Sequence, residues 1–172
     1  MLRTSGGSGG DIYALSMSGA WPARPVVVTP GYDGGADFSP DGKLMVYAST
    51  DSGPSQIYLM PFPKADRKWS VSTRGGTQAR FSRSGKQIFY RNESRMMVVD
   101  VETTGAQVRL SPPRELFTST FNAGALVTVA NYDVTPYGDF VMMQAEPGVP
   151  YISVILNWTT LLRRALAQPL RP

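Results

Sequence analysis

The chain has 172 residues, enough for one domain with a sizeable hydrophobic core. It contains neither Cys nor His, which excludes the usual zinc sites, thiol chemistry and catalytic triads with an imidazole base. Its 17 basic and 13 acidic residues give a formal net charge of +4, and the basic residues are spread along the chain instead of gathering on one nucleic-acid-binding face. We therefore expect no metal, no cofactor and no nucleic-acid partner.

Residues 1–10 are predicted to be a flexible Gly/Ser leader. Gly6-Gly7-Ser8-Gly9-Gly10 formally matches the Gly-x-Ser-x-Gly motif in which hydrolases present a serine nucleophile. That motif needs a strand before it, a helix after it and a base, and this leader offers none of them, so we interpret it as a linker. Since no apolar run approaches the roughly 20 residues of a membrane-spanning helix, membrane association is not expected either.

Three later stretches share one pattern, in which a short strand is followed by a tight turn and then by an apolar strand. They cover residues 36–47, 79–90 and 132–143, and Phe38, Phe81 and Val134 mark equivalent positions. The intervals between these positions are 43 and 53 residues. Because a period of about 40–45 residues is typical of four-stranded propeller blades, we attribute the longer interval to an insertion near residues 118–130.

The remaining strands follow from the same pattern. Third strands are predicted at residues 11–15, 56–60, 96–100 and 151–156, and outer strands at 26–29, 69–73 and 115–117. Glycine-rich links at 30–35 and 74–77 are expected to join one unit to the next. The predicted fold is all-β: a β-propeller of four-stranded antiparallel blades over residues 11–158, with about three blades per chain. Residues 159–172 are predicted to form a short C-terminal helix and tail.

The sequence Phe38-Ser39-Pro40-Asp41-Gly42-Lys43, followed by an apolar strand, resembles the WD-type repeat of TolB-like β-propellers. Residues 58–78 and 155–158 resemble the closing blades of propellers attached to bacterial serine/threonine kinases. This resemblance covers residues 11–158 and implies a periplasmic or other extracytoplasmic sensor in the full-length parent. The glycine-rich kinase loop and the His-Arg-Asp catalytic segment are absent, so it implies no kinase activity.

Propellers have four to eight blades, so about three blades make only a partial propeller. Unpaired strand edges invite association with other strands. The chain is therefore either a fragment of a larger propeller, or one part of a ring that is completed by oligomerisation. We expect a homodimer or a higher oligomer that forms by strand pairing.

These features favour a non-catalytic binding, sensing or protein-interaction module over an enzyme. Its ligand is expected to be a protein, a peptide or a small molecule at the top face of the propeller, where inter-strand loops meet on a rigid scaffold. Asp33 and Asp37 lie near a glycine-rich loop but lack the spacing of a calcium loop, so a metal role is not favoured. The candidate ligand contacts lie at or just before the inner strands: Tyr32, Asp33, Asp37, Gln78, Arg80, Asn131 and Asp133.

Two alternatives stay open. A small serine hydrolase, of the esterase or peptidase kind, can use Lys as its base, and Lys43 and Lys86 lie near Ser39, Ser82 and Ser84 in the sequence. Both lysines are expected at exposed hairpin tips, where an ordinary pKa argues against a catalytic role. The second alternative is a structural interaction piece from a truncated gene.

Overall fold

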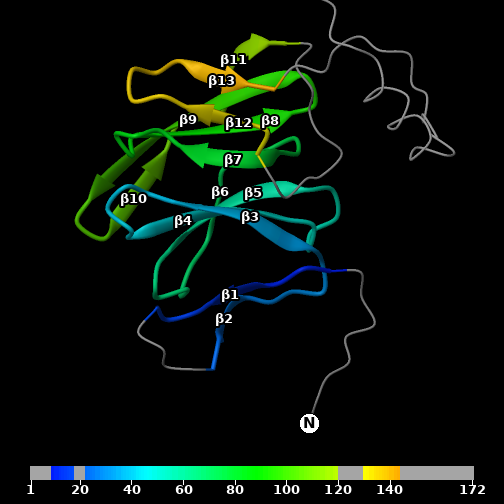
Figure 1. Cartoon of the computed structure of the whole chain (residues 1–172), viewed down its shortest axis with the longest axis vertical. Coiled ribbons are helices and arrows are strands. Elements are labelled where there is room, and N and C mark those ends of the chain that lie inside the picture. The colour runs from blue at the N-terminus through cyan, green and yellow to red at the C-terminus, as the bar shows by residue number, and fades with distance from the viewer. Residues whose placement is uncertain (1–8, 18–21, 120–129, 144–172) are drawn as a thin grey trace, which may run out of the picture.

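The computed structural model of the chain describes residues 9–17, 22–119 and 130–143. Within these residues it contains strands and no helix, which confirms the all-β prediction (Figure 1). The strands form antiparallel sheets. The leader up to residue 8, most of the predicted insertion, the predicted third strand at 151–156 and the predicted C-terminal helix lie outside the described residues.

The strands form four consecutive sheets along the chain. The first sheet pairs β1 (Ile12–Ala14) with β2 (Arg24–Val27). The second has the order β3 (Asp33–Phe38), β4 (Leu44–Ser49), β5 (Gln56–Pro61) and β6 (Trp69–Ser70). The third holds β7 (Thr77–Phe81), β8 (Gln87–Asn92), β9 (Arg95–Thr104), β10 (Gln107–Leu110) and β11 (Arg114–Thr118). The fourth pairs β12 (Tyr132–Val134) with β13 (Phe140–Met142).

The same hairpin opens the second, third and fourth sheets. In each, a hydroxyl at the start of the turn accepts the backbone N–H of a residue four or five places later: Ser39 from Leu44 (2.9 Å), Ser82 from Gln87 (3.1 Å) and Thr135 from Asp139 (3.0 Å). The turns contain Gly42, Gly85 and Gly138, whose φ angles are 69°, 71° and 93°. Only glycine adopts this conformation at low cost, so the sequence repeat is a repeat of turn geometry.

The sheets pack face to face in chain order, and the side chains of β4 show how. Met45 and Tyr47 belong to the core shared with β1–β2, whereas Val46 and Ala48 belong to the core shared with the third sheet. Successive side chains of a strand point to opposite faces, and both faces of β4 are covered. All residues from Leu44 to Ser49 are therefore buried.

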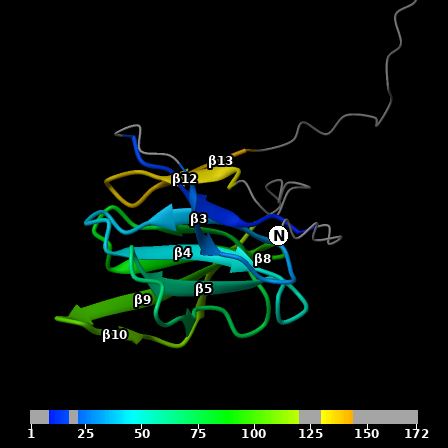
Figure 2. The ribbon, with the colours of Figure 1, turned by 90° about the horizontal axis from the view of Figure 1, so that it is seen from below.

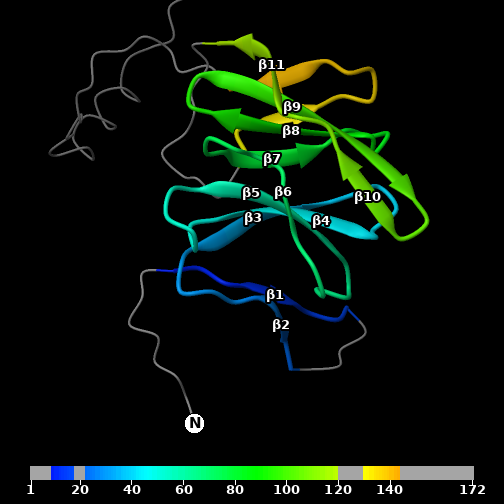
Figure 3. The same cartoon turned by 180° about the vertical axis from the view of Figure 1, so that it is seen from behind.

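The third sheet is covered on both faces in the same way. Ile88 and Tyr90 of β8 pack toward the second sheet, and Phe89 between them packs against β12–β13. Figures 1 and 3 show the resulting layers, with β1–β2 at one end of the stack. Figure 2 shows β3, β4 and β5 in order across their sheet, with β12–β13 on the side of β3 and β10 on the opposite side. β3 and β12–β13 therefore share one side of the stack, and β7 contacts β3.

Several strands differ from the prediction, among them β6, which spans Trp69–Ser70 instead of 69–73. β3 begins at Asp33, inside the predicted link 30–35, because a β-bulge between Gly34 and Asp37 accommodates the glycines within the strand. β2 spans residues 24–27 instead of 26–29. β10 is not among the predicted strands: β9 continues past the end of β8 and turns back at Gly105, so its second half pairs with β10 and its first half with β11.

Candidate ligand-binding site at the inner strands

β3, β7 and β12, the strands predicted to be inner ones, each carry a polar residue at the same position of the repeat. Asp37 lies opposite Val46, Arg80 opposite Phe89 and Asp133 opposite Val141 in their hairpins. These three polar residues therefore occupy equivalent places in consecutive sheets. Because the sheets are stacked, equivalent places along the strands become neighbouring places in space.

A hollow of about 510 Å³ opens over these strands, and we call it the inner hollow. Its volume falls within the range of about 300–1,000 Å³ that is usual for ligand sites. Three of the seven predicted ligand contacts line it, namely Asp37, Arg80 and Asp133. The other lining residues are Phe38, Pro40, Phe81, Ser82, Arg83, Ala130, Tyr132 and Val134.

Asp37 and Arg80, which both line the inner hollow, form an ion pair. The guanidinium Nη1 of Arg80 lies 3.6 Å from Asp37 Oδ1, and both side chains are about 30% exposed. The other carboxylate oxygen of Asp37 accepts the backbone N–H of Phe81 at 2.8 Å. Asp37 therefore binds the second sheet to the third through both of its oxygens.

Asp133 and Arg83 are the two charged groups of the inner hollow that remain available. Both residues are exposed. Asp133 Oδ1 accepts the backbone N–H of Val134 at 2.8 Å, which holds the carboxylate in place. In the part of the chain that the structure describes, neither Asp133 nor Arg83 forms an ion pair. The inner hollow thus presents one anionic and one cationic group beside a closed ion pair.

Tyr132 anchors the fourth sheet beneath the inner hollow. Its hydroxyl donates a hydrogen bond to the backbone oxygen of Gln78 at 2.7 Å and approaches that of Phe89 at 3.2 Å. Burial raises the pKa of Tyr132, and the nearby charges of Arg80 and Asp37 act on it in opposite directions. The hydroxyl therefore stays protonated and acts as a structural donor.

The other four predicted contacts lie toward the starts of the inner strands and do not line the inner hollow. Asp33 is 2% exposed, its carboxylate accepts the Thr29 hydroxyl at 2.7 Å, and its N–H donates to the Gly10 backbone oxygen at 2.7 Å. The ring of Tyr32 fills a cradle between Gly10 and Gly34, where an added Cβ would lie 2.8 Å from the ring. These contacts give both residues a structural role.

Gln78 and Asn131 also have backbone roles. Gln78 is 2% exposed and adopts a positive φ of 57° at the start of β7. The backbone oxygen of Asn131 accepts the N–H of Met143 at 3.1 Å, which extends the β12–β13 ladder. Sequence position alone did not separate these residues from Asp37, Arg80 and Asp133.

Arg83 is the functional candidate that sequence reasoning missed. It stands at the turn between β7 and β8, where the other two repeats have Pro40 and Pro136. A charged residue at a turn position that is otherwise Pro is a signal that marks this repeat as different. The exposed ring of Phe38, which packs edge-on against Phe62 at 4.9 Å, also forms part of the inner hollow.

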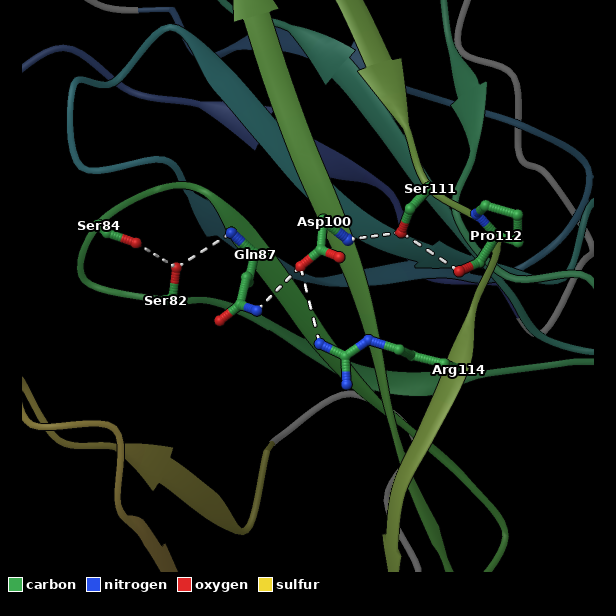
Figure 4. A network of polar contacts seen from close by, with 7 residues as sticks. All are labelled: Ser82, Ser84, Gln87, Asp100, Ser111, Pro112 and Arg114. Atoms are coloured by element: carbon green, nitrogen blue, oxygen red, sulfur yellow. Dashed lines mark hydrogen bonds and ion pairs between the residues drawn. The ribbon is translucent and has the colours of Figure 1, made fainter.

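The hydroxyls proposed as hydrolase nucleophiles take part in turn hydrogen bonds. Ser39 donates to Asp41 Oδ1 at 2.6 Å, and this bond holds the pKa of Asp41 below its usual value. Figure 4 shows Ser82 Oγ beside Ser84 Oγ at 3.1 Å while it accepts the backbone N–H of Gln87. In the same view, Asp100 joins Gln87 to Arg114. These contacts favour a structural role for the serines.

A second hollow of about 530 Å³, the outer groove, is lined by residues of the second and third sheets and their connections. Its walls come from the β5–β6 connection and the β9–β10 hairpin, and Trp69 and Val108 supply apolar surface. None of the predicted ligand contacts lines it. Among the described residues, no group of three or more acidic residues is placed to hold a metal ion, and no helix could span a membrane.

No protein-family model matches the sequence, and no curated protein matches it. Among solved structures, the chain is similar to that of a putative TolB from Agrobacterium tumefaciens, with 19% sequence identity and a TM-score of 0.49. The match covers 76% of this chain and 48% of that chain. The chain thus spans about half the length of that structure.

Proposed function

We propose that the chain is a non-catalytic binding module whose sheets are propeller blades and whose ligand site is the inner hollow. The observation that carries this proposal is the convergence of Asp37, Arg80 and Asp133, from equivalent positions of three sheets, on one hollow of ligand size. Polar groups that converge from a rigid scaffold are the usual make-up of a binding site.

The blade interpretation rests on turn geometry and packing. The same hydroxyl-capped hairpin recurs in three sheets, and each inner sheet buries both faces against its neighbours. In a β-propeller, four-stranded sheets are arranged radially and each contributes its inner strand to the central channel. Under this proposal β3, β7 and β12 are inner strands, and the inner hollow is part of the channel.

An NMR titration with fragments of varied chemistry tests the proposed site. A library of small neutral and charged fragments is added to 15N-labelled protein, and the backbone amide shifts are followed. We expect the shifts to gather at Ser82, Arg83 and Asp133, with the amides of Lys43 and Trp69 in the outer groove as internal controls. Shifts that gather at the outer groove would move the site there, and shifts spread over the whole surface would refute a defined site.

We also propose that two copies of the chain pair their terminal strands. In the repeat pattern β1 and β2 correspond to the third and fourth strands, β5 and β6, while β12 and β13 correspond to the first and second, β3 and β4. Neither end therefore holds a complete four-stranded unit among the described residues, and pairing of terminal strands between copies would yield a homodimer or a higher oligomer. Light scattering tests this directly, because a stable monomer contradicts it.

The extracytoplasmic location stays a proposal that rests on the sequence resemblance. It is supported by the WD-type repeat of residues 38–47 and by the likeness of residues 58–78 to sensor propellers. Fractionation of cells that express the full-length parent, with this segment detected by antibody, tests the location. Recovery with the cytoplasmic fraction would contradict it.

A further inference from the structure

We propose that the inner hollow takes a short zwitterionic peptide, whose carboxylate binds Arg83 and whose ammonium group binds Asp133. The proposal rests on the inner hollow being the ligand site and adds the chemical class of its ligand. It starts from the charges that line the hollow, which are two arginines and two aspartates.

The two inner charges are already engaged. Asp37 uses one oxygen for Arg80 at 3.6 Å and the other for the N–H of Phe81 at 2.8 Å. A ligand charge that approached this pair would have to compete with both contacts. The net attraction for a ligand must therefore come from the outer groups, Arg83 and Asp133.

These two groups have opposite signs and lie on neighbouring sheets. Asp133 is fixed by the bond from Val134 N–H to its Oδ1, which leaves Oδ2 for a ligand donor. Arg83 is exposed at the turn that leads from β7 to β8, and a guanidinium binds a carboxylate through two parallel hydrogen bonds. A ligand with a single charge would satisfy one group and be repelled by the other, whereas a zwitterion satisfies both.

The size and the apolar lining of the inner hollow select a peptide over a larger molecule. An extended dipeptide spans about 7 Å, close to the roughly 8 Å edge of a cube with the volume of 510 Å³. The ring of Phe38, which is 44% exposed, offers apolar surface for a small side chain between the two charged ends. A dipeptide with small apolar side chains meets both conditions.

Four forms of one ligand test the charge requirement at each end. L-alanyl-L-alanine, its N-acetyl form, its C-terminal amide and the doubly blocked form are titrated into 15N-labelled protein. We expect blocking of either end to lower the affinity about ten- to a hundredfold, which is the range of one charge-assisted hydrogen bond. Equal affinity for the free and the doubly blocked dipeptide would overturn the proposal.

Two substitutions assign each end to its residue. Arg83→Gln is expected to lower the affinity for the free dipeptide to the affinity that the unchanged protein has for the C-terminal amide. The affinity for the amide itself is expected to stay the same. Asp133→Asn keeps the acceptor for the Val134 N–H. It is expected to lower the affinity for the free dipeptide to that for the N-acetyl form, and to leave the affinity for the N-acetyl form unchanged. Arg109→Gln, an exposed arginine on β10 outside the inner hollow, is the matched control.

The outcomes separate this proposal from the proposed function. If fragments shift the amides of the inner hollow but the dipeptide does not bind, the hollow is a site and the zwitterion assignment is wrong. If neither fragments nor dipeptide shift these amides, both proposals fail. If the two variants weaken all four dipeptide forms equally, their effect is on the fold, and the assignment of ligand ends to Arg83 and Asp133 is refuted.

Discussion

Replacement of Tyr132 by Phe removes one oxygen atom and leaves the ring in place. The hydroxyl donates to the Gln78 backbone oxygen at 2.7 Å, and the side chain is only 4% exposed. Ring contacts such as that with Phe140, at 6.1 Å between centroids, do not need the oxygen. The substitution therefore isolates the hydrogen bond that attaches β12 to the third sheet.

The expected cost is about 1–3 kcal/mol in the free energy of unfolding, because a buried carbonyl loses its donor. Urea denaturation followed by tryptophan fluorescence measures this as a lower midpoint at an unchanged slope. Tyr137→Phe is the control, since Tyr137 is 94% exposed and its change is expected within about 0.5 kcal/mol. Equal stability of the two variants would refute the packing of β12–β13 on the third sheet.

Three further predictions concern the stacked core and its charges. Gly76→Ala should lower stability by about 1–3 kcal/mol, because its Cβ would lie 2.8 Å from Ile57 and 2.9 Å from Tyr90; an unchanged urea midpoint contradicts this. Burial raises the pKa of Tyr47 from 10.0 to about 12, so its contribution to stability is present below pH 10 and is lost as pH rises toward 12. Tyr47→Phe should therefore flatten the alkaline part of the stability–pH curve, and an unaltered curve would count against burial of this phenol. Asp37→Ala should cost about 1.5–3 kcal/mol through the lost bond to the Phe81 N–H, measured by urea denaturation and compared with the exposed Asp139→Ala.

Most strands could be predicted from the sequence because their signals are local. The turns at Gly42, Gly85 and Gly138 need a positive φ, and the apolar run 44–48 needs cover on both faces. Either feature can be recognised in a dozen residues, independently of the rest of the chain. The β9–β10 hairpin was not predicted, because nothing in the sequence of β9 marks the point where its pairing with β8 ends. In the structure β9 pairs with β8 up to Asp100 and with β10 from Val101 to Thr104.

The candidate site was likewise predicted only in part. The repeat identified the inner strands, and three of the seven residues chosen from them line the inner hollow. The sequence by itself therefore determined most of the strands, their turns and a set of seven polar residues that includes Asp37, Arg80 and Asp133. Tertiary structure decided which neighbours become ligand contacts, because each step along a strand moves a side chain by about 3.3 Å and reverses its face. The β-bulges before Asp37 and Arg80 alter that alternation. The stacking of the sheets brings Arg83 and Asp133, from segments about 50 residues apart, to the lining of one hollow.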